Sequence, residues 1–285
     1  MTSLRMMSWL AVLAVAATFA SAWAARVGPT HGTFGVAQRS THDLSESYME
    51  VLDADARIYI WHNFLTTEEC DYLRMKAEKR LERSGVVDSA TGKEAVSDVR
   101  TSEGMFFARA EDAVIESIER RVAEWTLTPV HNGEGLQVLR YKPGQKYDAH
   151  WDWFFDAENT RNGGNRWSTV LMYLHEGLEE GGETVFPKLP APGGSNPQLS
   201  DCARHALAVR PRKGDAILFH SVTFNGTFEE RSMHGACPVL RGEKWSMTKW
   251  IHQAHYRMQD KYDEEADQQA QRVADYREAS KHTDL

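Results

Sequence analysis

The apolar positions divide the chain into a helical part followed by a part rich in short strands. A capping box at residues 66–69 predicts the start of a helix, because the side chains of Thr66 and Glu69 can each accept the other's backbone N–H. Cys70 then begins a run of apolar residues at helical spacing, so we expect it to face the core. A second helix is predicted over residues 113–125, where apolar residues recur at steps of three and four.

After residue 130 the pattern changes to short stretches of β-branched and aromatic residues, which Gly, Pro, Asn and Asp separate. Helices followed by strands indicate an α+β domain that is mainly β, with an antiparallel sandwich or barrel supported by helices on one side. The predicted strands are 136–141, 167–174, 183–186, 206–209, 216–220 and 245–252.

The first 25 residues have the pattern of a targeting segment. Arg5 precedes an uncharged, Ala-rich stretch, and small residues at 20 and 22 and at 22 and 24 form two sites typical of signal peptidase cleavage. An uncleaved signal anchor is the alternative, because about 20 uncharged residues can just span a bilayer. Both interpretations place the rest of the chain in the endoplasmic reticulum lumen or secretory pathway, and the second makes it a type II membrane protein.

Composition agrees with one globular domain between two polar segments. The 285 residues are 41% hydrophobic and 26% charged. We expect a linker at 26–50, the domain at 51–255 and a polar tail at 256–285 outside the core. The net charge of −8 is spread along the chain, which gives no support to a nucleic-acid partner.

Three residues have the types and spacing of a metal site. His150 and Asp152 would point to the same face of a strand, and His234 offers a third ligand. Two histidines and one carboxylate form the facial triad of non-haem iron(II) oxygenases, whereas structural zinc requires four ligands, usually with Cys. Lys244 lies ten residues beyond His234, where a cation can bind the distal carboxylate of 2-oxoglutarate.

The segment from about residue 59 to residue 252 resembles the catalytic domain of prolyl 4-hydroxylases, particularly the single-chain plant and green-algal type. The resemblance covers roughly two thirds of the chain, and its motifs occur in the same order. They are GLQVLRY (135–141), GQKY (144–147), His150-x-Asp152, GGET (181–184), PRKGDA (211–216), HGACP (234–238) and GEKWSMTKWIH (242–252).

The resemblance implies a fold and an activity. The fold is a double-stranded β-helix, or jelly roll, with supporting N-terminal helices. The activity is 4-hydroxylation of prolyl residues in proline-rich secretory proteins, with O₂ and 2-oxoglutarate as co-substrates, iron(II) and L-ascorbate as cofactors, and succinate and CO₂ as co-products. Collagen-like repeats remain a second class of peptide substrate.

The resemblance also assigns roles to individual residues. His150, Asp152 and His234 would bind iron, while Tyr141 and Thr184 would assist Lys244 in binding 2-oxoglutarate. Arg166 matches a family position near the peptide groove, although a surface arginine is the alternative, since residues 156–166 depart from the family pattern. Residues 84–92 and Arg100 resemble loops that cover the bound peptide.

Two other functions are compatible with the sequence. One is a jelly-roll binding module that has lost its chemistry, which an intact triad with Lys244 argues against. The other is a related 2-oxoglutarate oxygenase that acts on lysyl side chains or on a small molecule, and hydroxylated peptides would distinguish it.

The chain has three cysteines and one glycosylation sequon that fit a lumenal protein. We expect Cys202 and Cys237 to form a disulfide, which would tie the loop of His234 to the sheet, and Cys70 to stay reduced. Three unpaired thiols are the alternative. Asn225 begins the sequon Asn-Gly-Thr in a polar stretch.

Overall fold

A computed structural model describes residues 47–87, 94–96 and 98–281 of the chain. The predicted signal segment at 1–25 lies outside the described residues, and so does most of the predicted linker at 26–50. The end of that linker is instead part of a strand, because residues 48–50 pair with 60–62. Among the described residues, no helix has the length and apolar character needed to cross a bilayer.

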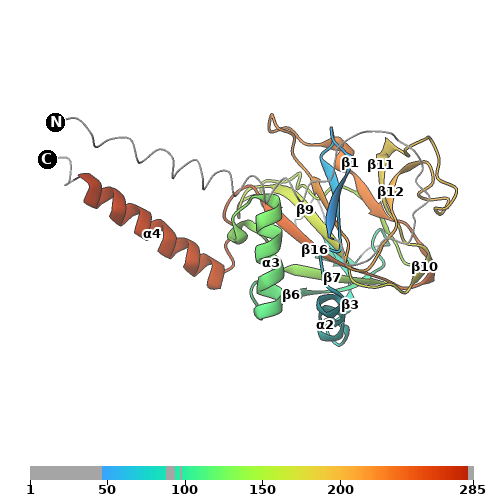
Figure 1. Cartoon of the computed structure of the whole chain (residues 1–285), viewed down its shortest axis with the longest axis horizontal. Helices are drawn as coiled ribbons and strands as arrows, with labels where there is room; N and C mark the ends of the chain where they lie inside the picture. Colours follow the sequence, from blue (N-terminus) through green and yellow to red (C-terminus); the bar gives the residue numbers. More distant parts are fainter. Residues whose placement is uncertain (1–46, 88–93, 97, 282–285) are drawn as a thin grey trace, which may run out of the picture.

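Antiparallel strand pairs form two main sheets, which are seen in Figure 1. The larger sheet contains, in spatial order, β1 (Tyr48–Asp53), β2 (Ile58–His62), β13 (Ala216–His220), β9 (Arg166–Tyr173), β16 (Lys244–His252), β7 (Leu136–Tyr141), β6 (Glu103–Phe107) and β3 (Glu82–Arg83). The smaller sheet contains β12 (Ala206–Val209), β11 (Thr184–Pro190), β14 (His234–Ala236) and β8 (Tyr147–His150). Two short ribbons pair β10 (Leu178–Gly181) with β15 (Val239–Gly242) and β4 (Gly85–Val87) with β5 (Glu94–Val96).

Each face of the larger sheet buries a separate core. One core lies between the two sheets, where side chains of β2 and β13 pack against Phe186 of β11 and Leu207 of β12. The other core lies between the larger sheet and the helices α2 (Thr67–Glu78) and α3 (Ala113–Thr126), which cover one side of it (Figure 1). This is the predicted jelly roll with supporting helices.

The helices follow their local sequence signals. Thr66 and Glu69 form both hydrogen bonds of the predicted capping box, and Cys70 is fully buried one residue later. The second predicted helix extends one residue further than expected, to Thr126, and Asp112 caps its first turn. Two single-turn 3₁₀ helices, η1 (Val130–Asn132) and η2 (Glu230–Ser232), complete the connections.

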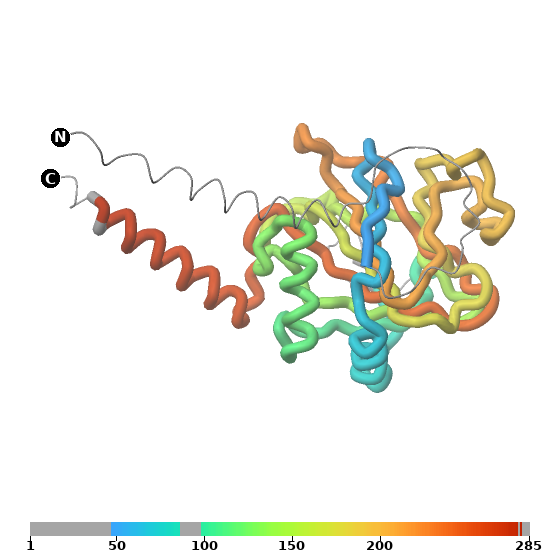
Figure 2. Tube along the Cα trace, in the orientation of Figure 1, coloured from blue at the N-terminus to red at the C-terminus, as the bar shows by residue number. Residues whose placement is uncertain are grey.

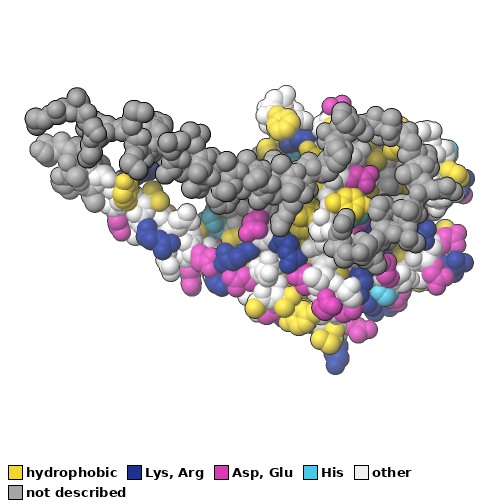
Figure 3. Space-filling model, in the orientation of Figure 1, with side chains coloured by type: hydrophobic (Ala, Val, Ile, Leu, Met, Phe, Trp, Pro, Cys, Tyr) yellow, Lys and Arg dark blue, Asp and Glu magenta, His cyan; other side chains and the backbone are white. Residues whose placement is uncertain are grey.

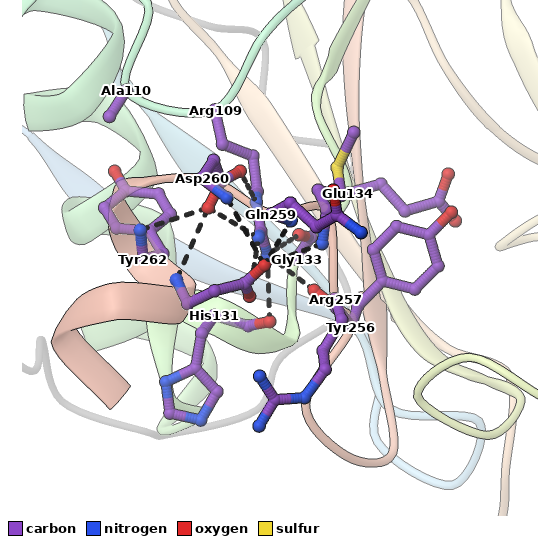
Figure 4. Close-up of polar contacts among 12 residues, drawn as sticks. Arg109, Ala110, His131, Gly133, Glu134, Tyr256, Arg257, Gln259, Asp260 and Tyr262 are labelled. Atoms are coloured by element: carbon purple, nitrogen blue, oxygen red, sulfur yellow. Dashed lines mark hydrogen bonds and ion pairs between the residues drawn. The ribbon is translucent and has the colours of Figure 1, made fainter. Parts of the chain in front are cut away.

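The predicted boundary at residue 256 is too early, because the next residues are bound to the domain. The buried guanidinium of Arg109 donates to both carboxylate oxygens of Asp260 at 2.6 and 2.7 Å and to Asp263 at 3.0 Å. It also donates to the carbonyl of Tyr256 at 2.8 Å, and Tyr262 is fully buried beside it (Figure 4). A polar sequence pattern does not reveal that Asp260 has a partner 151 positions away in the chain.

Beyond this attachment the helix α4 (Lys261–Lys281) projects from the domain (Figure 2). Figure 3 shows acidic and basic side chains interspersed along it, as expected for a solvated helix. The predicted polar tail is therefore a helix that is anchored at its first turn and exposed afterwards.

The cysteines pair as expected. Cys202 and Cys237 form a disulfide with a Cα–Cα distance of 5.9 Å, and Cys70 is the free, buried cysteine of α2. Cys237 directly follows β14, so the bridge connects the strand that carries His234 to the loop before β12. Burial raises the pKa of the Cys70 thiol to about 12, which keeps it protonated and unreactive.

Candidate metal centre

The metal site is formed where β8 and β14 pair. His150 is the last residue of β8, His234 is the first residue of β14, and the two are direct partners in the register. Asp152 follows β8 by two residues. One ligand atom from each of the three lies within 4.8 Å of the others, with Asp152 oxygens 3.6 Å from Nε2 of His150 and 3.7 Å from Nε2 of His234.

Hydrogen bonds prepare both imidazoles as metal ligands. Nδ1 of His150 lies 2.9 Å from the carbonyl oxygen of Asp148, and Nδ1 of His234 lies 2.9 Å from that of Ser232. A carbonyl can only accept, so Nδ1 carries the proton and the lone pair of Nε2 faces Asp152. Two imidazoles and one carboxylate are the donor set that suits iron(II) with open positions, so the residues fit the expected metal.

The charge states of these residues agree with metal binding. Burial lowers the pKa of His234 to about 4, so the ring is neutral near pH 7. Burial opposes ionisation of Asp152, but the charge of protonated His234 and a hydrogen bond with His150 outweigh it and hold the pKa of the carboxyl below its usual range. The hydroxyl of Thr169 donates to Asp152 at 2.6 Å and fixes its orientation.

Lys244 lines the same cavity, of about 40 Å³, as the three metal-binding residues. Its ammonium is buried and lies 3.3 Å from the hydroxyl of Thr184, and no carboxylate within the described part of the chain is at ion-pair distance. Tyr141 is opposite Lys244 in the strand register, and its ring lies 5.5 Å from the ammonium. The predicted co-substrate residues are therefore brought together.

The electrostatics of Lys244 favour a bound anion. Burial lowers the pKa of its ammonium to about 7, with only partial compensation from the charge of Glu183. Burial of a cation without a carboxylate partner costs free energy. A carboxylate that enters the cavity removes that cost and raises the pKa of the ammonium again, so Lys244 stays charged. The cavity therefore suits a small dicarboxylic acid that places one carboxylate at Lys244 and its other end at the metal-binding residues.

A groove of about 520 Å³ opens beside the metal ligands, and Arg166 lies within it rather than on the outer surface. Arg166 donates to the carboxylate of Glu134 at 2.7 and 3.2 Å and to the backbone carbonyl of Asp152 at 3.4 Å. Nε2 of His252 lies 2.9 Å from the same Glu134 oxygen that accepts from Nε of Arg166. Sequence reasoning missed Glu134 and His252, although each lies at the edge of a motif that the resemblance named.

Arg100 lines both the cavity and the groove. Its guanidinium donates to Gln137 at 2.8 Å and to the carbonyl of Gly85 at 3.2 Å, and it lies 4.9 Å from the ring of Tyr147. Of the predicted covering loop at 84–92, residues 88–92 lie outside the described residues.

The sequon residue Asn225 is exposed in a turn between β13 and η2. Its side chain accepts hydrogen bonds from the backbone N–H and the hydroxyl of Thr227 at 3.2 and 2.8 Å. The position is accessible, and its glycosylation stays a prediction.

Comparisons with known proteins identify similar chains. The model of the 2OG-Fe(II) oxygenase superfamily matches residues 136–252. The chain is 49% identical over 216 residues to probable prolyl 4-hydroxylase 3 of Arabidopsis thaliana, with 75% of each protein covered. It is 47% identical over 210 residues to prolyl 4-hydroxylase 5 of the same plant, with 73% of this chain and 72% of the relative covered. The solved 2OG complex of a viral collagen prolyl hydroxylase from Paramecium Bursaria Chlorella virus-1 has a TM-score of 0.51 and 28% identity, and covers 71% of this chain and 98% of its own.

Loss of any one of the three metal-binding side chains should remove tight iron binding. We expect His150→Ala, Asp152→Ala and His234→Ala each to weaken iron(II) binding by at least about 100-fold, because even a residue that only orients a ligand contributes up to that factor. The measurement is iron(II) titration of the folded variants, with the exposed His205→Ala as the matched control. Near-normal affinity in one variant would mean that its residue is not a ligand.

Proposed function

The chain belongs to the prolyl 4-hydroxylase family of the 2OG-Fe(II) oxygenases, because it is 49% and 47% identical to relatives across 75% and 72% of their lengths, and we propose that it hydroxylates prolyl residues of proline-rich secretory proteins. The observation that carries this proposal is one cavity that contains a two-His, one-carboxylate triad and a buried lysine with no carboxylate partner among the described residues, next to a groove. In this proposal the triad binds the metal, the buried lysine binds the co-substrate and the groove binds the peptide.

The protein's own residues bind and orient the reactants. His150, Asp152 and His234 hold the iron, and Lys244 binds the distal carboxylate of 2-oxoglutarate with help from Tyr141 and Thr184. Iron and 2-oxoglutarate, when bound, supply the oxidation itself: oxygen gives one atom to the prolyl C4 hydroxyl and the other to succinate, and carbon dioxide leaves. We expect L-ascorbate to keep the iron reduced, as the family resemblance implies.

The groove supports a peptide as the substrate rather than a free small molecule. It is an open channel of about 520 Å³ beside the ligands, much larger than the 40 Å³ cavity around Lys244. Aromatic rings line it, and aromatic-lined grooves bind proline-rich segments in the polyproline II conformation. Arg166 is fixed by Glu134 and offers further N–H groups near Asp152, where a peptide carbonyl can accept.

Three features support a lumenal location. The pattern at 1–25 is that of a signal peptide or anchor. The disulfide between Cys202 and Cys237 is of a kind that oxidising compartments permit, and Asn225 is exposed for glycosylation. Proline-rich proteins of the same compartment are then the accessible substrates.

Turnover assays test the proposed reaction directly. The purified chain with iron(II), ascorbate and 2-oxoglutarate should form succinate faster when a polyproline peptide is present, and mass spectrometry should find 4-hydroxyproline in the peptide. A lysine-rich peptide of equal length is the control. Hydroxylysine without hydroxyproline, or no succinate at all, would contradict the proposal in favour of a lysyl oxygenase or an inactive binding module.

Lys244→Ala should raise the 2-oxoglutarate requirement about 30-fold or more, because a desolvated carboxylate loses its charge-assisted partner. Iron(II) binding should change little, which separates this variant from the ligand variants. Lys244→Arg should not restore activity, since the forked guanidinium is larger than the ammonium it replaces. The measurement is succinate formation as a function of 2-oxoglutarate. An unchanged dependence in the Ala variant would remove Lys244 from the site.

N-terminal processing tests the proposed compartment. We expect the mature chain to begin near Trp23 or Ala25 if the signal is cleaved, and to keep its N-terminus in a membrane fraction if it is an anchor. N-terminal sequencing of the protein from its native cells distinguishes these results. An intact Met1 on protein in the cytosolic fraction would contradict a secretory location.

A further inference from the structure

Four aromatic side chains form a continuous cluster next to the metal ligands, which we term the aromatic wall: Trp151, Trp153, Phe155 and Phe228. Trp153 stacks on Phe228 with ring centroids 4.8 Å apart and an angle of 11° between the planes. It also stacks on Trp151 at 5.0 Å and 27°. Phe155 meets Trp151 and Trp153 edge-on at 6.1 and 6.0 Å, so the rings constrain one another as a single packed unit.

The aromatic wall is exposed although it is rigidly held. Phe155 is 67% exposed and Phe228 is 45% exposed, while Trp153 is buried behind them. Trp151 is fixed by a 3.0 Å hydrogen bond from its indole N–H to the carbonyl of Glu230. Contiguous, exposed apolar rings of this kind are typical of binding surfaces, and their rigidity lowers the entropy lost when a ligand binds.

The aromatic wall is continuous with the substrate groove. Trp151, Trp153 and Phe155 line the groove together with the ligands His150 and Asp152. Three positions separate Phe155 from Asp152, so their Cα atoms are at most about 11 Å apart. One turn of a polyproline II helix is three residues and rises about 9 Å. A ring one turn from the reacting proline therefore faces the same side and lies within reach of Phe155.

We propose that the aromatic wall is a subsite for a second proline ring of the substrate, located one polyproline II turn from the ring that is hydroxylated. This inference rests on the proposed function and adds a substrate class to it. The preferred segments carry prolines at a spacing of three residues, as in uninterrupted polyproline. An isolated proline fills the site of reaction and leaves the aromatic wall exposed to water.

Phe224 provides a matched control on a neighbouring loop. It is 88% exposed, and its ring lies 4.4 Å from the guanidinium of Arg57 rather than in the groove. Phe155→Ala and Phe224→Ala each remove one exposed phenyl ring and leave the core unchanged. If the location of the ring matters, only Phe155→Ala should lower the hydroxylation of polyproline peptides.

The test is a cycle between enzyme and substrate variants. A polyproline peptide and derivatives with one proline at a time replaced by alanine are assayed by mass spectrometry for hydroxylation of one defined residue. With the wild-type chain, replacement of the proline one turn away should lower kcat/KM roughly 5- to 10-fold. Phe155→Ala should show that loss with the parent peptide and no further loss with the derivative, because the two changes remove the same contact. Phe224→Ala should behave as the wild type.

A peptide with a single proline separates this inference from the proposed function. Phe155→Ala should lower kcat/KM on this peptide far less than on polyproline, because no second proline ring reaches the aromatic wall. If Phe155→Ala keeps full kcat/KM on polyproline, or if no position of the peptide couples to Phe155, the inference is overturned while the hydroxylase function stands. If no peptide acquires hydroxyproline with the wild type, the proposed function fails and the inference fails with it.

Discussion

The antiparallel pairing of β8 with β14 is the constraint on which the site depends. It places His150 opposite His234, so two ligands that are far apart in the chain share one face. Gly235 permits this close approach, since a Cβ there would lie 3.0 Å from the carbonyl of Tyr147 and 3.2 Å from the backbone nitrogen of Ala149. The disulfide at Cys237 holds the other end of β14, so the ligand strand is fixed at both ends.

The cations around the site differ in whether the described part of the fold supplies a carboxylate partner for them. Lys249 is buried like Lys244, but it donates to the carboxylate of Glu119 at 2.6 Å. Arg166 likewise has Glu134. Lys244 has only the hydroxyl of Thr184 as a hydrogen-bond partner in the described structure, and burial lowers its pKa. This contrast indicates that the fold itself supplies the counter-charges of Lys249 and Arg166, whereas the proposed partner of Lys244 is the co-substrate.

Local signals could be predicted from the sequence, and long-range contacts could not. The capping box at Thr66 depends on residues three apart, and it forms as expected. The ligands and Lys244 were found through spacing and family resemblance. By contrast, β14 is only three residues long and has no strand pattern of its own, because its pairing with β8 and β11 defines it. The burial of Tyr262 depends on its partner Glu119, which no local pattern connects to it.

The small cavity and the groove share the metal ligands His150 and Asp152 and differ in most of their other lining residues. The small cavity around Lys244 is lined largely by residues of the two sheets, so an exchange there changes the charge or volume that is available to the proposed dicarboxylic acid. The groove is open and is lined partly by the segment after β8, including the exposed Phe155, where side chains can be exchanged without loss of core packing. Exchanges in that segment alone can therefore direct the proposed oxidation to different peptides, because they leave His234, Lys244 and the sheet residues around Lys244 unchanged.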